Sequence, residues 1–170
     1  CSILLTDHAG TQASLWVRNP DHCRELLADR ENRRLLPGVP IPPQVEITSE
    51  IDVAIDGAEL LLAAIPTKYL RETLASIADQ LTLNRPVISV VKGIENDTFL
   101  RPSQIIEETL GSRDVVALSG PSHAEEIARK LPASVVAASG DVALAKRVQQ
   151  MFSTDRFRVY TNQDLIGVEL

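Results

Sequence analysis

The sequence of 170 residues is poor in cysteine and in aromatic residues. It holds two cysteines, Cys1 and Cys23, and aromatic residues make up 4% of the chain. Two cysteines are too few for the disulfide framework of a small secreted protein, and they lack the paired spacing of a metal site. We therefore expect two free thiols and no bound metal.

Long hydrophobic runs and excess positive charge are also lacking. No apolar run approaches the roughly 20 residues that span a bilayer, and the start CSILLTDHAG has no signal-peptide pattern. The net charge of −6 argues against broad contact with nucleic acid or an acidic membrane. We expect a cytoplasmic protein with no nucleic-acid partner and no membrane insertion, which binds any anion in a local pocket.

What the chain does have is an alternation of short apolar runs and capped helical segments. Hydrophobic residues make up 44% and charged residues 24%, as in a soluble protein with one core. The runs predict strands at 13–17, 45–48, 60–65, 86–91, 115–118, 134–138 and 157–160. The segments between them predict helices at 21–30, 49–55, 67–80, 102–110, 121–130 and 141–152.

This alternation is typical of an α/β fold with a doubly wound, Rossmann-like and mainly parallel sheet. Most of the predicted strands are apolar throughout, as expected of strands that are buried on both faces. The proline-rich segment 35–43 predicts a surface loop. No G-x-G-x-x-G turn occurs, although such folds normally bind a pyrophosphate there.

The first residues suggest why that turn is lacking. The chain begins with Cys1 rather than Met, and its first ten residues are typical of the end of a helix that stops at Gly10. We therefore interpret the chain as a piece of a longer protein, truncated at the first strand of its sheet, with the phosphate-binding turn just before Cys1.

Three places at the expected carboxyl edge of the sheet carry residues suited to chemistry. Arg18 follows the second strand of the expected fold, where an arginine can meet the 2′-phosphate of NADP, although a solvated strand end fits equally well. The segment 63–70 leads from a strand into a helix and can pack beside a cofactor, or it is a simple helix start. Lys92 ends an apolar strand before Gly93 and can meet a phosphate or ketone oxygen, although such a lysine is more often merely the first solvated residue.

The segment LSGPSHAEE predicts a polar cradle at the same edge. We expect Gly120 to end a strand, and Ser122 to hold an anion or carbonyl together with backbone amides of the helix start. His123 has no acidic partner at a fixed spacing, so we interpret it as a surface histidine or one that supports a site indirectly. Glu125 and Glu126 suit the first turn of a helix.

Six segments in this order resemble the N-terminal domain of bacterial NAD(P)-dependent glycerol-3-phosphate dehydrogenases. They are SLWVRNP, LLPGVPIPP, VVKGIE, LSGPSHAEEIA, LPASVVAAS and FRVYTNQDLIGVEL. The resemblance covers essentially the whole chain. It implies an oxidoreductase that reduces dihydroxyacetone phosphate to sn-glycerol 3-phosphate, for phospholipid synthesis, with NAD or NADP as the cofactor.

The resemblance also implies roles for single residues. Lys92, Gly120 and Ser122 match substrate-binding positions, and Arg18, Lys92 and Ala124 match cofactor-binding positions. The lysine presumed to exchange a proton lies beyond Leu170 in this family, so no catalytic residue is expected within the piece, which should be inactive alone. The full-length protein could form a homodimer.

The implied domain organisation is an incomplete cofactor-binding domain at residues 1–162, followed at 163–170 by the start of an all-helical substrate domain. Two other functions stay open. One is a non-catalytic module that binds or senses a dinucleotide, and the other is a related reductase of another small phosphorylated or carboxylated substrate.

Overall fold

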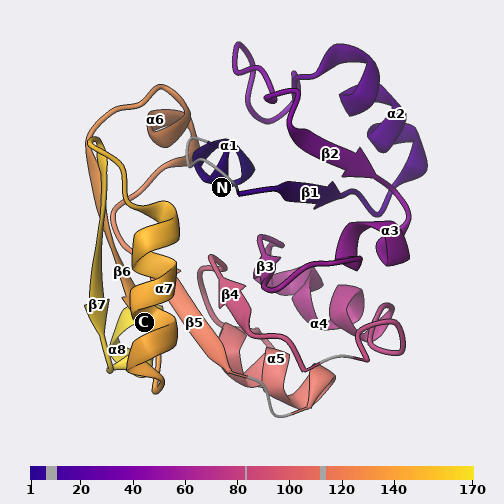
Figure 1. Cartoon of the computed structure of the whole chain (residues 1–170). Helices are drawn as coiled ribbons and strands as arrows, with labels where there is room; N and C mark the ends of the chain where they lie inside the picture. The colour runs from indigo at the N-terminus through magenta and orange to yellow at the C-terminus, as the bar shows by residue number, and fades with distance from the viewer. Residues whose placement is uncertain (7–10, 83, 112–113) are drawn as a thin grey trace. The chain divides into compact units, whose positions relative to one another are not determined.

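The computed structural model describes residues 1–6, 11–82, 84–111 and 114–170. The chain divides into two compact units. Unit 1 comprises residues 1–58 and 123–132, and unit 2 comprises residues 59–122 and 133–170. Figure 1 labels the elements in chain order: α1 (Ser2–Leu5), β1 (Ala13–Trp16), α2 (Pro20–Asp29), β2 (Val45–Thr48), α3 (Ile51–Ile55), β3 (Leu61–Ala63), α4 (Thr67–Ala75), β4 (Val87–Ser89), α5 (Pro102–Leu110), β5 (Val115–Ser119), α6 (Ala124–Ala128), β6 (Ala133–Ala138), α7 (Val142–Phe152), β7 (Phe157–Asn162) and α8 (Leu165–Glu169).

Unit 1 is built on the parallel pair β1 and β2, which are in register from Ala13↔Val45 to Trp16↔Thr48. Helix α2 begins sharply because the Asn19 side chain accepts hydrogen bonds from the two amides at its start and Pro20 occupies the first turn. Its buried side chains join those of β2 in a small core made of Cys23, Leu26, Ile41, Val45 and Ile47. Both cysteines are free, as expected.

The proline-rich segment 35–43 is a loop, as predicted, but it is only partly on the surface. Val39 and Ile41 are buried, and Ile41 packs in the core of unit 1. Its prolines exclude regular structure, whereas its apolar side chains still gain free energy from burial. The prediction of a surface loop was therefore right for the backbone and wrong for these two side chains.

Unit 2 contains a five-stranded sheet in the order β3-β4-β5-β6-β7. Strands β3, β4 and β5 run parallel, β6 is antiparallel to β5, and β7 is parallel to β6. All three residues of β4 and four of the five in β5 are buried, as expected of central strands. The predicted fold class, a Rossmann-like α/β fold with a mainly parallel sheet, is confirmed.

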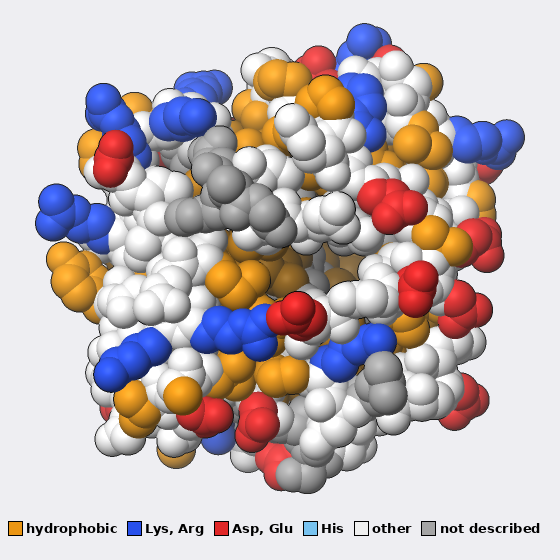
Figure 2. Space-filling view, viewed as in Figure 1, with side chains coloured by type: hydrophobic (Ala, Val, Ile, Leu, Met, Phe, Trp, Pro, Cys, Tyr) orange, Lys and Arg blue, Asp and Glu red, His pale blue; other side chains and the backbone are white. Residues whose placement is uncertain are grey.

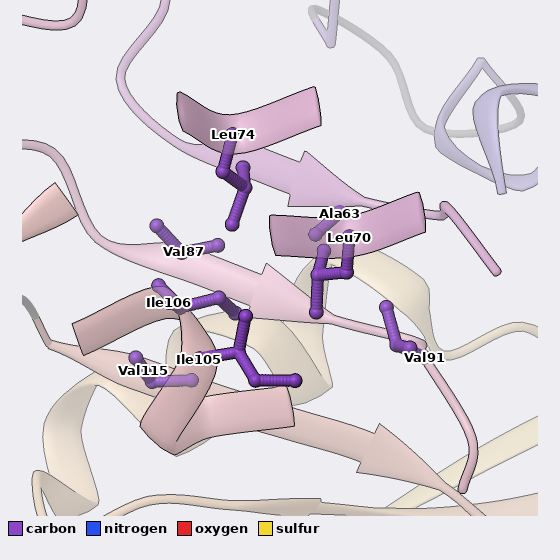
Figure 3. Packing of buried hydrophobic residues seen from close by; sticks show 8 residues of the cluster. All are labelled: Ala63, Leu70, Leu74, Val87, Val91, Ile105, Ile106 and Val115. Carbon is purple, nitrogen blue, oxygen red and sulfur yellow. The ribbon is translucent and has the colours of Figure 1, made fainter. Parts of the chain in front are cut away.

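Helices α4 and α5 pack together over the parallel strands of unit 2. Figure 3 shows Leu70 and Leu74 of α4 and Ile105 and Ile106 of α5 gathered along β4, in one cluster with Val87. The cluster is completed by Ala63, Val91 and Val115. Burying one such aliphatic side chain contributes roughly 1.5–3 kcal/mol, so this core fixes the strand ends from which the polar residues emerge.

Helices α4 and α6 differ most from their predicted bounds. Helix α4 ends at Ala75 rather than at residue 80, because residues 76–80 continue as turns with shorter-range hydrogen bonds such as Ile77 N–H to Leu74 O. Helix α6 begins at Ala124 rather than at Pro121. The expected helix stop at Gly10 lies outside the described residues.

The surface carries charges of both signs. Figure 2 shows Lys and Arg side chains interspersed with Asp and Glu over the visible face. Among the helices that the structure describes, none has the length and apolar character needed to cross a bilayer.

Candidate functional site

The carboxyl ends of β4 and β5 meet at one edge of the sheet in unit 2. The two strands are parallel neighbours, with Val87 opposite Val115 and Ser89 opposite Ala117. Lys92 follows β4 after two further apolar residues, and Gly120 follows β5 directly. Because parallel strands end at the same edge, the fold brings together residues that lie 28 positions apart.

The Lys92 ammonium is held between two backbone carbonyl groups of the segment that follows β5. Its Nζ donates to Gly120 O at 2.9 Å and to Ser122 O at 3.4 Å. An ammonium has three N–H donors, and within the described residues these carbonyls take two of them. The side chain is exposed, so the third donor can meet an oxygen of a ligand.

The position of Lys92 is fixed by the buried residue that precedes it and by a hydrogen bond from α4. Val91 is buried, so the change from apolar core to solvent occurs between these two residues. The hydroxyl of Thr67, the first residue of α4, donates to the carbonyl oxygen of Lys92 at 2.5 Å. Gly93 then turns the chain with a φ of 94°, a conformation that glycine adopts without strain.

Gly120 is required by a close approach of the backbone. Its φ is 156°, and a Cβ atom there would lie 2.9 Å from the carbonyl oxygen of Ser134 and 3.0 Å from Cα of Val135, both on β6. Both contacts are with backbone, which cannot move aside without breaking the β5–β6 pairing. Glycine therefore allows β6 to return beside β5 while the Gly120 carbonyl accepts from Lys92.

The cradle of backbone amides expected in this segment stays a prediction. The hydrogen bonds at this place come from the carbonyl oxygens of Gly120 and Ser122, which accept from Lys92, and the Ser122 hydroxyl also donates to Gly120 O at 3.3 Å. Helix α6 begins only at Ala124 and has five residues. Beside the predicted cradle, the segment positions a cation, the Lys92 ammonium, through its carbonyl oxygens.

His123 and the two glutamates after it lie where the sequence placed them. His123 is the exposed residue that precedes α6, with extended backbone and no side-chain cap, and its carbonyl oxygen accepts from Ile127 N–H. Glu125 and Glu126 are exposed in the first turn of α6.

Arg18 and Ala124 belong to unit 1. Arg18 is exposed and follows β1 by two residues, as expected for the end of this strand. Ala124 is the first residue of α6 and is also exposed. The structure thus brings together Lys92, Gly120 and Ser122 in unit 2, and the cofactor roles of Arg18 and Ala124 stay predictions.

Sequence reasoning missed an ion pair beside Lys92. Arg71 of α4 donates to Glu95 with Nε to Oε1 at 3.0 Å and Nη2 to Oε2 at 2.8 Å. The hydrogen bonds from Arg71 and from the Thr98 hydroxyl hold the pKa of Glu95 below its ordinary value. One signal was available, since Arg71 lies four residues after Thr67 and hence on the same face of α4.

A second missed feature is the carboxylate of Glu169, whose side chain is only 2% exposed. It accepts from the amide of Ser103 at 2.8 Å, from the hydroxyl of Ser103 at 2.7 Å and from Arg101 Nη1 at 2.5 Å. These donors belong to the start of α5, where the helix dipole favours an anion. Glu169 therefore fastens the end of α8 to the start of α5 within unit 2.

Comparison with known proteins identifies the family. Residues 2–145 match the family model described as NAD-dependent glycerol-3-phosphate dehydrogenase N-terminus. The chain is 45% identical over 164 residues to glycerol-3-phosphate dehydrogenase [NAD(P)+] of Chlorobium phaeobacteroides, which covers 95% of this chain and 49% of the relative. It is 42% identical over 170 residues to the enzyme of the same name from Chlorobium limicola, with coverages of 98% and 51%.

A solved structure agrees with the sequence comparison. The crystal structure of glycerol-3-phosphate dehydrogenase from Coxiella burnetii superposes with a TM-score of 0.90 at 28% identity, over 99% of this chain and 51% of that one. The chain spans about half the length of the curated relatives it matches. Because the family model matches most of the sequence, the chain belongs to the family of NAD-dependent glycerol-3-phosphate dehydrogenase N-terminal regions.

Proposed function

We propose that the full-length protein reduces dihydroxyacetone phosphate to sn-glycerol 3-phosphate with NADH or NADPH, and so supplies the backbone of glycerophospholipids. Membership of the family supports the reaction class. The observation that carries the proposal is the exposed Lys92 ammonium, held over the carboxyl edge of the sheet by the carbonyl oxygens of Gly120 and Ser122.

The Lys92 ammonium can stabilise either of two negative charges in this reaction. The substrate phosphate is an anion, and the ketone oxygen gains negative charge as hydride reaches the carbonyl carbon. A cation whose direction is fixed before the substrate arrives stabilises that charge without reorganising. The two carbonyl oxygens fix the direction of the Lys92 ammonium, and its third N–H can donate to the substrate.

The Lys92 ammonium also fits a nicotinamide dinucleotide, which carries phosphate and amide oxygens. Lys92 lies at the carboxyl edge of a parallel sheet, where open α/β folds bind such ligands. The hydroxyl groups of Thr67 and Ser122 at this edge already donate to carbonyl oxygens, so toward a ligand they can only accept. When bound, the reduced nicotinamide supplies the hydride. We assign Lys92 to both substrate and cofactor, Gly120 and Ser122 to the substrate, and Ala124 and Arg18 to the cofactor, with Arg18 at its adenosine end.

The family resemblance supports the remaining proposals. Residues 1–162 would form the cofactor-binding part, and residues 163–170 would begin the helical substrate domain. The lysine that exchanges the proton would follow Leu170, so the piece of 170 residues would not turn over alone. A cytoplasmic location and a homodimer of the full-length protein are part of the same proposal.

Turnover by the full-length protein tests this function against a non-catalytic module. NADPH and dihydroxyacetone phosphate are mixed with the protein, and oxidation of the reduced nicotinamide and formation of glycerol 3-phosphate are followed together. An enzyme consumes both substrates in equal amounts. Calorimetric binding of NADPH without its oxidation would favour the sensing module, and oxidation with another small ketone alone would favour a related reductase.

A further inference from the structure

The segment that carries Lys92 depends on contacts other than burial for its position. The Lys92 loop, residues 92–95, leaves the core after Val91, and its first three residues are exposed. Gly93 adds conformational freedom at its left-handed turn. Exposed loops with few buried contacts are the parts of a protein that open most easily, so some polar contact must hold this one.

Helix α4 holds the Lys92 loop at both ends. At the first end, the Thr67 hydroxyl donates to the carbonyl oxygen of Lys92 at 2.5 Å. At the other end, Arg71 forms two parallel hydrogen bonds to the carboxylate of Glu95, at 3.0 and 2.8 Å. Thr67 and Arg71 are four residues apart in a helix, so they lie one above the other on the same face.

The contact at Glu95 has the geometry of a specific clamp. A guanidinium and a carboxylate joined by two parallel bonds are fixed in direction as well as in distance. The Glu95 side chain is 15% exposed and Arg71 36%, so the pair is partly shielded from solvent. The Thr98 hydroxyl donates to the same carboxylate, and Glu95 N–H donates to Leu100 O at 3.0 Å.

We propose that Arg71 is a positioning residue, which through the Glu95 carboxylate fixes the Lys92 loop and hence the direction of the Lys92 ammonium. Arg71 acts on the site through Glu95, and Glu95 is three residues from Lys92. The kinetic role of Arg71 rests on the proposed function, whereas its control of Lys92 does not.

Arg71 has a second partner, and this offers a matched control. Its Nη1 lies 3.0 Å from the Glu108 carboxylate of α5, which is 54% exposed. If Arg71 merely ties α4 to α5, loss of Glu108 should matter as much as loss of Glu95. If Arg71 positions Lys92, only the loss of Glu95 should change the properties of Lys92.

A kinetic comparison in the full-length protein separates these roles. The variants are Glu95→Gln, Glu108→Gln, Arg71→Ala and the double variant Arg71→Ala/Glu95→Gln. Since a small misplacement of a catalytic group can cost up to about a hundredfold in rate, we expect kcat/KM for dihydroxyacetone phosphate to fall about tenfold or more in Glu95→Gln and Arg71→Ala. The double variant should be no worse than either single one, because both changes break one clamp.

The same comparison includes a conservative substitution. A lysine at position 71 keeps the charge but cannot form two parallel bonds to a carboxylate. We therefore expect Arg71→Lys to recover part of the activity lost in Arg71→Ala. Glu108→Gln should stay within about twofold of the unaltered protein, as expected when an exposed ion pair is lost. Equal losses in Glu95→Gln and Glu108→Gln would overturn the positioning role.

Chemical labelling tests the clamp without any turnover. The rate at which an amine-reactive acylating reagent modifies Lys92 is measured by mass spectrometry, with exposed Lys146 of α7 as the internal reference. We expect the Lys92 rate, relative to Lys146, to rise several-fold in Glu95→Gln and to stay unchanged in Glu108→Gln. An unchanged Lys92 rate in Glu95→Gln would refute the clamp even if the protein proves to be an active dehydrogenase.

The two arms also distinguish failure of the clamp from failure of the proposed function. If the unaltered full-length protein does not oxidise NADPH with dihydroxyacetone phosphate, the proposed reaction is wrong, and labelling of Lys92 still decides the role of Arg71. Glu95→Gln changes one atom type and keeps the shape of the side chain, so this arm stays decisive if Arg71→Ala does not fold.

Discussion

The Lys92 ammonium lies 2.9 Å from the carbonyl oxygen of Gly120, and this hydrogen bond joins the segment after β4 to the end of β5. The same ammonium reaches Ser122 O at 3.4 Å. Two neighbouring parallel strands thus contribute a cation and the acceptors that orient it. This arrangement and the unit that supports it depend on a few contacts, each of which can be removed by a single substitution.

Gly120→Ala should destabilise the protein. Its new Cβ would lie 2.9 Å from Ser134 O, so β5 and β6 would have to separate locally. Overpacking of this kind typically costs about 1–3 kcal/mol in the free energy of unfolding. Chemical denaturation measures the loss, with Gly140→Ala as the control because a Cβ at Gly140 meets no atom within 4 Å. Equal denaturation midpoints for the two variants would show that the close approach does not exist.

Glu169→Ala should loosen the attachment of α8. The change leaves Arg101 and the Ser103 amide without the carboxylate that they share. Removing one partner of a buried ion pair typically costs about 3–5 kcal/mol. The matched control is Glu59→Ala, which removes the partner of Arg147 at a site where the glutamate is 77% exposed and should cost at most about 1 kcal/mol. Equal losses of unfolding free energy in urea would count against a buried anchor at Glu169.

The ion pair of Glu95 should make stability depend on pH on the acidic side. Hydrogen bonds from Arg71, and then from Thr98, hold the pKa of Glu95 below its ordinary value of 4.5. A carboxyl group with a lowered pKa stabilises the folded state fully above that ordinary value, and the contribution disappears as pH falls through the lower one. Glu108 shares Arg71, so it stays unaltered in both proteins that are compared.

The measurement is the difference in urea midpoint between the unaltered protein and Glu95→Gln at a series of pH values. We expect a constant difference from neutral pH down to about pH 5, and a shrinking one below the ordinary pKa of a glutamate. A difference that widens on acidification would have the wrong sign and would contradict the charge-assisted bond.

Arg18→Ala in the full-length protein should weaken the binding of NADPH more than the binding of NADH. The two cofactors differ by the 2′-phosphate, and an arginine at the end of this strand suits that group. A lost charge-assisted hydrogen bond costs about 1.5–3 kcal/mol, which is roughly 10- to 150-fold in Kd. Calorimetry with each cofactor measures the ratio. An equal change for both cofactors would return Arg18 to the role of a solvated residue at a strand end.

The elements with strong local signals could be predicted from sequence. Strand β2 and helix α5 have the predicted bounds, Val45–Thr48 and Pro102–Leu110. In α5 a proline occupies the first turn and Gly111 follows the last residue, so both ends are marked by backbone chemistry. The place of Lys92 at a strand end was predictable because an apolar run stops abruptly before it.

Contacts between distant residues gave no such signal. Arg101 and Glu169 are 68 residues apart, and no spacing pattern connects them. Helix α6 begins three residues later than predicted, beyond two residues whose carbonyl oxygens accept from a lysine in the loop after β4. The local sequence Gly-Pro-Ser-His favours an early helix start, because proline suits the first turn of a helix. Only the folded sheet brings Lys92 to these carbonyl groups.

The most direct test of the account is the effect of Lys92→Ala on the full-length protein, with Lys146→Ala as the matched control. If the Lys92 ammonium stabilises charge on the reacting oxygen or phosphate, its loss should lower kcat/KM for dihydroxyacetone phosphate by about a hundredfold to a thousandfold. The same variant should keep its free energy of unfolding in urea within about 0.5 kcal/mol, because the side chain is exposed. Lys146→Ala should change neither value, and a kcat/KM for Lys92→Ala equal to that of the unaltered protein would contradict the account.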